Sequence, residues 1–205
     1  AAMRRVEESV KHLHAAFDCY MKMQDAESAL KVAAHSFVSA EGGVGMAPVR
    51  EKALQIAPPE SPLTGYLLAI HGRVLGVQMD DYPGAMAAIE KALEIARRSG
   101  DRKLEFRARS EAAFVSMGNM EPQRFLENAL EAAELSRGVD DPLEVSQVYQ
   151  GLTSYYGLRG NQAKFEHYLE LYGRFAKRAG DRQRLSSHHL AIAVNANLRG
   201  DWESA

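Results

Sequence analysis

The sequence predicts an all-α protein in which about five helix–turn–helix repeats, with a period near 40 residues, stack into a solenoid. Three observations support this prediction. The stretch 82–101, YPGAMAAIEKALEIARRSGD, places its apolar residues at the three-and-four spacing of one helical face. Similar runs end at Asp101, Asp141 and Asp181, which lie forty residues apart. Alternating Val, Ile and Thr segments and the Asn-Gly or Asp-Gly turns of hairpins are nearly absent.

A shift of forty residues brings small or apolar positions of the chain into register. In the first helix of each pair these positions are Gly72, Ala112, Leu152 and Ile192, and in the second helix they are Ala92, Ala132 and Tyr172. One helix pair cannot cover its own apolar stripe, so neighbouring pairs must stack to bury it. We place the repeats in one domain, 1–205, at 4–40, 62–101, 102–141, 142–181 and 182–205, with an insertion at 41–61.

Cap residues and apolar periodicity predict where the helices begin and end. Asp25 suits an N-cap, Pro83 suits a first helical turn, and Gly100 suits the residue just past a helix end. The glycine cluster at 41–45 lacks the Lys and Ser/Thr of a phosphate-binding loop, so we interpret it as a helix C-cap followed by a loop. The expected helices span 4–23, a segment from about 25, a short stretch at 48–56, and then 63–78, 82–99, 102–117, 121–137, 142–158, 162–179 and 183–198.

Composition and charge limit the class of function. The chain has 205 residues, a net charge of −2 and one cysteine, Cys19. The near-neutral charge argues against a general nucleic-acid-binding protein. A single cysteine excludes an intrachain disulfide and favours a reducing, cytoplasmic compartment. No apolar run has the length of a membrane span, and the charged amphipathic segment at the start is not a signal peptide.

The last five residues, DWESA at 201–205, are typical of the start of a further helix. We therefore expect the chain to be a fragment of a longer polypeptide that ends within a repeat. Apolar surface at Trp202 and on the first helix of the fifth repeat would then be exposed, so self-association through the repeat ends is one expected mode of interaction.

The repeats resemble the tetratricopeptide-repeat family. The matching features are a small residue in the first helix (Gly72, Ala112), a bulky residue three positions later (Leu75, Val115) and alanines in the second helix. The phrases ALEIARRSGD and NLRGDWESA look like the repeat arrays of bacterial signal-transduction ATPases and large LuxR-type transcriptional regulators. The resemblance implies a right-handed α-α superhelix that serves as a sensor or scaffold segment beside other domains.

The same resemblance implies that the first helices line a concave groove, which the column at 69, 109, 149 and 189 should face. Arginines and aromatic rings in such a groove suit an acidic or aromatic peptide segment, through charge-assisted hydrogen bonds and stacking. The alternative is that these residues are ordinary solvated or inter-repeat positions. The candidate binding residues are Tyr66, Arg73, Phe106, Arg109, Tyr149, Tyr156 and His189.

Other kinds of chemistry have less support in the sequence. His12 and Cys19 have no evident further ligand and fall in columns of packing residues, so we expect core packing and no metal site. The adjacent carboxylates at 80–81 and 140–141 fall in predicted turns, where they suit helix caps better than acid–base catalysis. The basic run at 97–109 is explained by solvated helix ends beside C-terminal carbonyl groups.

The predicted function is therefore protein–protein interaction, in a scaffold or sensor segment of a larger bacterial signalling or transcription-regulatory protein, with no enzymatic activity and no metal or cofactor. The expected partner is a protein or peptide segment, or a neighbouring domain of the same polypeptide, and neither a membrane nor nucleic acid. The alternative is a repeat domain that senses a small molecule held in the concavity.

Overall fold

The computed structural model describes residues 2–35 and 40–200, and every regular element in these ranges is a helix. The prediction of an all-α protein is therefore confirmed for the described part of the chain. The elements are α1 (Ala2–Lys22), α2 (Ala26–Ala33), α3 (Ala40–Gly45), α4 (Ala47–Ile56), α5 (Pro62–Gln78), α6 (Tyr82–Ser99), α7 (Arg102–Gly118), α8 (Pro122–Leu135), the short 3-10 helix η1 (Ser136–Gly138), α9 (Pro142–Leu158), α10 (Gln162–Ala179) and α11 (Arg182–Leu198).

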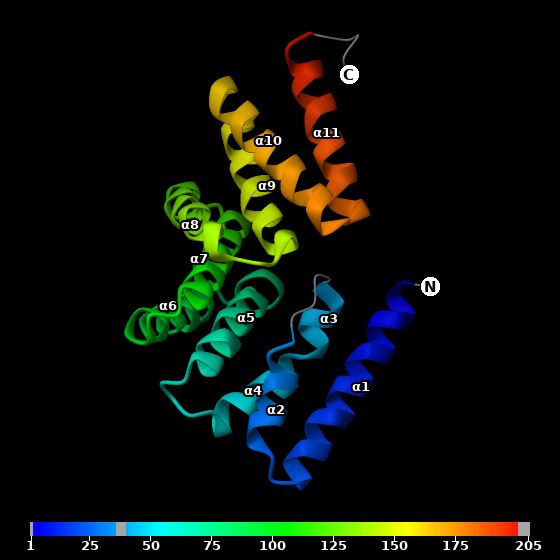
Figure 1. Ribbon diagram of the computed structural model, residues 1–205, viewed down its shortest axis with the longest axis vertical. Coiled ribbons are helices and arrows are strands. Elements are labelled where there is room, and N and C mark those ends of the chain that lie inside the picture. Colours follow the sequence, from blue (N-terminus) through cyan, green and yellow to red (C-terminus); the bar gives the residue numbers. More distant parts are fainter. Residues whose placement is uncertain (1, 36–39, 201–205) are drawn as a thin grey trace. The chain divides into compact units, whose positions relative to one another are not determined.

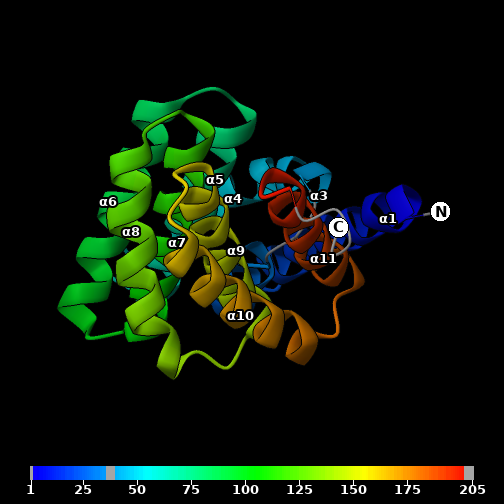
Figure 2. The ribbon, with the colours of Figure 1, turned by 90° about the horizontal axis from the view of Figure 1, so that it is seen from above.

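The chain forms two compact units, residues 1–125 and 126–205, and the boundary falls within α8. In the first unit α5 packs against both α6 and α7, while α1 packs against α2 and α3 (Figure 1). The short helix α4 contacts α2, α3 and α5. In the second unit α9 and α10 lie side by side, and α11 contacts both of them (Figure 2). Each unit is thus built from helices that pack in neighbouring pairs.

The predicted helix boundaries agree closely with the observed ones. Helices α6, α9 and α10 begin and end at the residues expected from the sequence, and the short helix expected in the insertion is α4. The first residues of α5, α7, α9 and α11 are 62, 102, 142 and 182. Those of α6, α8 and α10 are 82, 122 and 162.

Aspartates at the helix starts explain this agreement. The side chains of Asp81, Asp101 and Asp181 each accept a hydrogen bond from a backbone N–H three residues on, and Asp141 accepts two, all within the first turn of the helix that follows. Asp25 caps α2 in the same way, as predicted. These bonds satisfy amides that have no partner inside the helix. At the other end of α6, Gly100 adopts a left-handed conformation with φ of 67°, which suits a residue without a side chain.

Glycines on α5 bring three helices of the first unit into close contact. An ideal Cβ at Gly72 would lie 2.7 Å from Ile89 Cγ1 and 2.9 Å from the backbone oxygen of Ala85, both on α6. At Gly76 it would lie 2.5 Å from Val115 Cγ1 on α7. The close approach of the helices at Gly72 depends on the absence of a side chain.

Two interpretations of the sequence are wrong. The cluster at 41–45 does not form a C-cap and loop, because these residues lie in helix α3. Glycine is a poor helix former, and tertiary bonds hold this helix: Arg50 donates to the Gly43 oxygen at 2.9 Å, and a ring nitrogen of His14 lies 2.8 Å from the Gly45 oxygen.

The second correction concerns His12 and Cys19, which were expected in the core but are both exposed. The buried face of α1 carries Phe17 instead, which is 2% exposed. Helix α1 packs on α2 and α3, so the register of the later helix pairs does not transfer to it. Trp202, where the sequence predicts exposed apolar surface, lies outside the described residues.

Candidate functional site

A cluster of charged side chains lies between α5 and α7 in the first unit. The carboxylate of Glu111 on α7, whose side chain is 3% exposed, is 3.3 Å from a guanidinium nitrogen of Arg73 and 3.3 Å from one of Arg107. Arg107 precedes Glu111 by four residues and so lies on the same face of α7. Arg73 comes from α5, and its guanidinium lies 4.1 Å from the ring centre of Phe114. One buried carboxylate is therefore shared by two arginines from different helices.

Arg50 on α4 adds a third guanidinium, which is fully buried. It donates hydrogen bonds to the backbone oxygens of Gly43, at 2.9 Å, and of His35, at 3.0 Å. Burial lowers its pKa to about 10, while the negative charge of Glu111 acts in the opposite direction and the positive charge of Arg107 adds to the lowering. Arg50 is still protonated near neutral pH. Its role is to fix the backbone carbonyls of Gly43 in α3 and of His35, the second residue after α2.

His71 on α5 lies close to the same charges. Burial lowers its pKa from the ordinary value of 6.5; Glu51 counteracts this shift and Arg50 adds to it. The ring Nδ1 is buried and has no hydrogen-bond partner among the described residues. The imidazole is therefore uncharged near neutral pH and adds nothing to the positive charge of the cluster.

Arginine side chains predominate in the cluster. The guanidiniums of Arg73 and Arg107 pair with the Glu111 carboxylate, while Arg50 interacts with that carboxylate only through the longer-range attraction of opposite charges. The side chains of Arg73 and Arg107 remain 22% and 14% exposed, so solvent reaches both. A guanidinium carries five N–H donors in a planar fork that matches a carboxylate or phosphate. This arrangement suits recognition of an anionic group.

The sequence-predicted residues of the first unit have different surroundings. Arg73 belongs to the charged cluster described above. Arg109 on α7 is half-buried, and Phe106 is buried at 1% exposure. Tyr66 on α5 is half-buried and lines an apolar hollow beside α2.

The predicted residues of the second unit belong to an aromatic cluster. Tyr156 stacks on Tyr168 with ring centres 5.5 Å apart and planes at 6°, and Tyr168 in turn lies 6.3 Å from Tyr149. Tyr149 also stacks on Phe175 at 5.5 Å. These rings come alternately from α9 and α10, so Tyr149 and Tyr156 help to join that pair. His189 on α11 is exposed, and its ring centre lies 5.6 Å from that of His188.

Sequence reasoning missed the partners of Arg73. Arg107 was assigned to a solvated basic run, and neither Glu111 nor Arg50 was assigned a role. One signal was present: Glu111 falls in the column of Gly151, where a charged side chain needs a partner if it is buried. A glutamate four residues after an arginine on one helix also suggests an ion pair. Arg50 lies in the insertion at 41–61, outside the repeats, so the repeat pattern could not predict its place near the cluster.

Within the two described ranges, no group of three or more His, Cys, Asp or Glu side chains is arranged to hold a metal ion. No described helix combines the length and the apolar character needed to cross a lipid bilayer. A comparison with protein-family models finds no match, and neither does a comparison with curated proteins.

Proposed function

We propose that this chain is a protein-interaction segment, a right-handed α-α superhelix of tetratricopeptide-like repeats, that binds an acidic segment of a partner protein. Helix starts at 62, 102, 142 and 182 support a repeat of forty residues. The packing of α5 with α6, and of α9 with α10, supports helix pairs as the repeating unit. The resemblance of the repeats supports a place in a larger bacterial signalling or transcription-regulatory protein.

The arginine–glutamate cluster is the observation that carries the binding proposal. Arg73 and Arg107 are held in place by a shared carboxylate and, for Arg73, by the ring of Phe114. Side chains that are already ordered lose less conformational entropy when a ligand binds. A partner carboxylate would approach the exposed part of these two side chains and share their guanidiniums with Glu111. Binding is then favoured by charge-assisted hydrogen bonds between the guanidiniums and the partner carboxylate.

The proposed activity is binding without catalysis. Both oxygens of the Glu111 carboxylate are paired with guanidiniums, one with Arg73 and one with Arg107, so this group already has structural partners. The adjacent carboxylates at 80–81 and 140–141 include the caps Asp81 and Asp141. These groups already have structural partners.

Fluorescence anisotropy with a labelled peptide of alternating Glu and Gly, and with its Gln counterpart, tests the proposal. We expect the acidic peptide to bind more tightly, and the double variant Arg73→Gln/Arg107→Gln to weaken that binding more than tenfold, since hydrogen bonds to charged groups contribute roughly 1.5–3 kcal/mol each. The control Arg97→Gln/Arg102→Gln removes the same charge from exposed positions. Equal affinity of both double variants would refute the proposal.

A second experiment tests the wider groove predicted from the sequence. Partners captured by the parent chain are compared with those captured by Arg73→Ala/Arg109→Ala. If the variant retains every partner as well as the parent does, these two arginines do not form a binding groove, whatever the synthetic peptide shows.

A further inference from the structure

The first unit also has an apolar hollow of about 660 Å³ between α2, the end of α4 and the start of α5. Ligand sites in proteins commonly have volumes of about 300–1,000 Å³. The hollow therefore has the size of a small-molecule site. Its apolar lining includes Leu30, Ile56, Pro58, Pro62, Leu63 and Tyr66.

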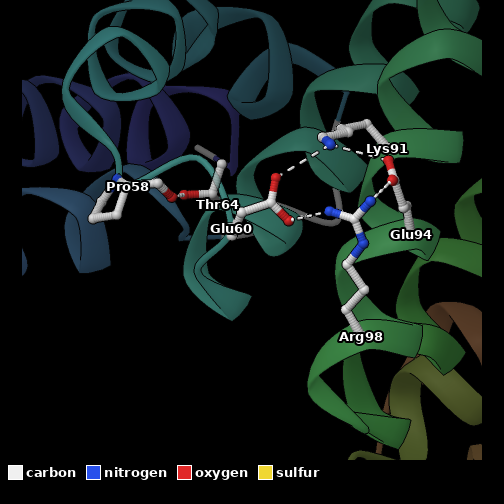
Figure 3. A network of polar contacts seen from close by, with 6 residues as sticks. All are labelled: Pro58, Glu60, Thr64, Lys91, Glu94 and Arg98. Carbon is white, nitrogen blue, oxygen red and sulfur yellow. Dashed lines mark hydrogen bonds and ion pairs between the residues drawn. The ribbon is translucent and has the colours of Figure 1, made fainter.

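The wall formed by the loop between α4 and α5 is held by hydrogen bonds. Thr64 Oγ1 donates to the backbone oxygen of Pro58 at 2.7 Å, as Figure 3 shows. Because the Thr64 hydrogen is used in this way, the Ser61 hydroxyl donates to Thr64 Oγ1 at 2.8 Å. Ser61 Oγ also accepts the Thr64 N–H at 3.1 Å. The loop is thus fixed to the first turn of α5.

Ion pairs fix the same loop to α6. Glu60 lies 3.3 Å from Lys91 Nζ and 2.9 Å from an Arg98 nitrogen, and both cations also pair with Glu94 (Figure 3). Exposed ion pairs contribute little singly, but here four side chains restrain one loop from the side of α6. A wall restrained on two sides is pre-organised, so a ligand need not order it on binding.

The lining offers an apolar surface with no net charge. Among the described residues that line it, only Glu27 and Lys31 are charged, and they pair with each other at 2.6 Å. The hydroxyl of Ser61 is already bonded, and two prolines in the lining have no N–H to donate. A peptide backbone would bring amides that need partners, and a charged ligand would be opposed by one member of the Glu27–Lys31 pair.

We propose that this hollow is a binding site for an uncharged, apolar small molecule that has no amide groups. The site is separate from the charged cluster, since it is lined by α2, the α4–α5 loop and the first turns of α5. Apolar surface on the ligand replaces water against Leu30, Ile56 and Leu63. The Glu27–Lys31 pair stays intact at the edge.

Titration of the full chain with N-phenyl-1-naphthylamine, an uncharged fluorescent probe, tests the proposal. We expect saturable binding of one probe per chain. Ala26→Phe fills the hollow from an exposed lining position and should raise the dissociation constant at least tenfold. The control Gln55→Phe adds the same ring at an exposed position outside the lining and should change it less than twofold. Ile56→Trp fills the hollow from another wall, so the test does not depend on one variant.

Competition experiments define the ligand class. We expect 1-decanol to displace the probe at lower concentration than decanoate or decylammonium does. Tighter binding of decanoate would overturn the uncharged class and assign recognition to Lys31. Probe binding that does not saturate, or that is unchanged in both filled variants, would overturn the site itself. Binding of the acidic peptide should be the same in Ala26→Phe and in the parent, so the two proposals succeed or fail separately.

Discussion

Replacement of Glu111 by Gln should lower stability and raise affinity for an acidic partner at the same time. The substitution keeps the size of the side chain and one carbonyl oxygen, but removes the negative charge that Arg73 and Arg107 share. Both guanidiniums then lose the charge that they share, and each retains at most a neutral hydrogen bond with the side chain at position 111. The free binding surface gains one unit of positive charge.

The size of the stability change follows from the burial of the three side chains. Breaking a fully buried ion pair costs about 3–5 kcal/mol. Glu111 is 3% exposed, but Arg73 and Arg107 are 22% and 14% exposed and keep part of their hydration. Gln also retains some hydrogen bonding. We therefore expect the free energy of unfolding to fall by roughly 2 kcal/mol.

The change in binding has the opposite sign. Glu111 competes with a partner carboxylate for the same two cations, so its neutralisation should raise the affinity for the acidic peptide by about tenfold at low salt. Salt screens charges that are accessible to solvent, so the gain should shrink as ionic strength rises.

Urea unfolding and peptide anisotropy on the same preparations measure both quantities. Glu90→Gln, at an exposed position on α6, is the matched control, and its unfolding free energy should stay within about 0.5 kcal/mol of the parent value. The reasoning is refuted if Glu111→Gln loses stability and also loses affinity for the peptide, because the cluster would then be a structural element with no part in binding.

Three further predictions concern stability. Gly72→Ala should lower the free energy of unfolding by about 1–3 kcal/mol because the added Cβ would overlap α6. Gly118→Ala, whose added Cβ would have nothing within 4 Å, should raise the free energy of unfolding by about 0.4–1 kcal/mol. Thermal unfolding of both variants measures these changes. Burial lowers the pKa of His71, so as the pH falls below 6.5 the unfolded chain takes up a proton on this imidazole before the folded chain does, and the parent loses stability. His71→Gln should reduce this loss. Urea unfolding at several pH values measures the difference. Tyr149→Phe removes a buried hydroxyl that lies 3.0 Å from Ser136 Oγ and should cost about 1 kcal/mol in urea unfolding.

Each of these predictions has an outcome that contradicts it. Equal effects of the two glycine substitutions would mean that α5 and α6 are not in close contact at Gly72. An unchanged pH dependence in His71→Gln would show that the imidazole is solvated in the folded chain. No change in Tyr149→Phe would mean that the hydrogen bond between Tyr149 and Ser136 makes no measurable contribution to stability.

Most helix boundaries could be predicted from the sequence because they depend on local chemistry. An aspartate that bonds to the amides of the next turn, or a glycine that adopts positive φ, acts through its immediate neighbours. Asp81 and Gly100 therefore mark the ends of α6 in the sequence as well as in the structure. Helix α3 was missed because its glycines form a helix only with the help of distant groups, including Arg50.

The candidate site could be predicted only in part, because its geometry depends on side chains that meet from different helices. The family resemblance placed Arg73 among the groove residues but could not show that its guanidinium meets Glu111, 38 residues later in the chain. It also placed Tyr149 and Tyr156 in the groove, while the structure shows that α10 supplies aromatic rings that stack against them. The end helix α1 shows the converse error: His12 is exposed because the repeat register does not extend to it.

The most direct test of the binding proposal is a heteronuclear NMR titration that follows the side-chain Nε–Hε signals of the arginines, assigned with Arg73→Gln and Arg107→Gln. When the acidic peptide is added, the signals of Arg73 and Arg107 should shift together along one saturable curve, and those of Arg97 and Arg102 should stay in place. Shifts confined to the exposed arginines, with Arg73 and Arg107 unchanged at peptide saturation, would contradict the assignment of the charged cluster as the binding site.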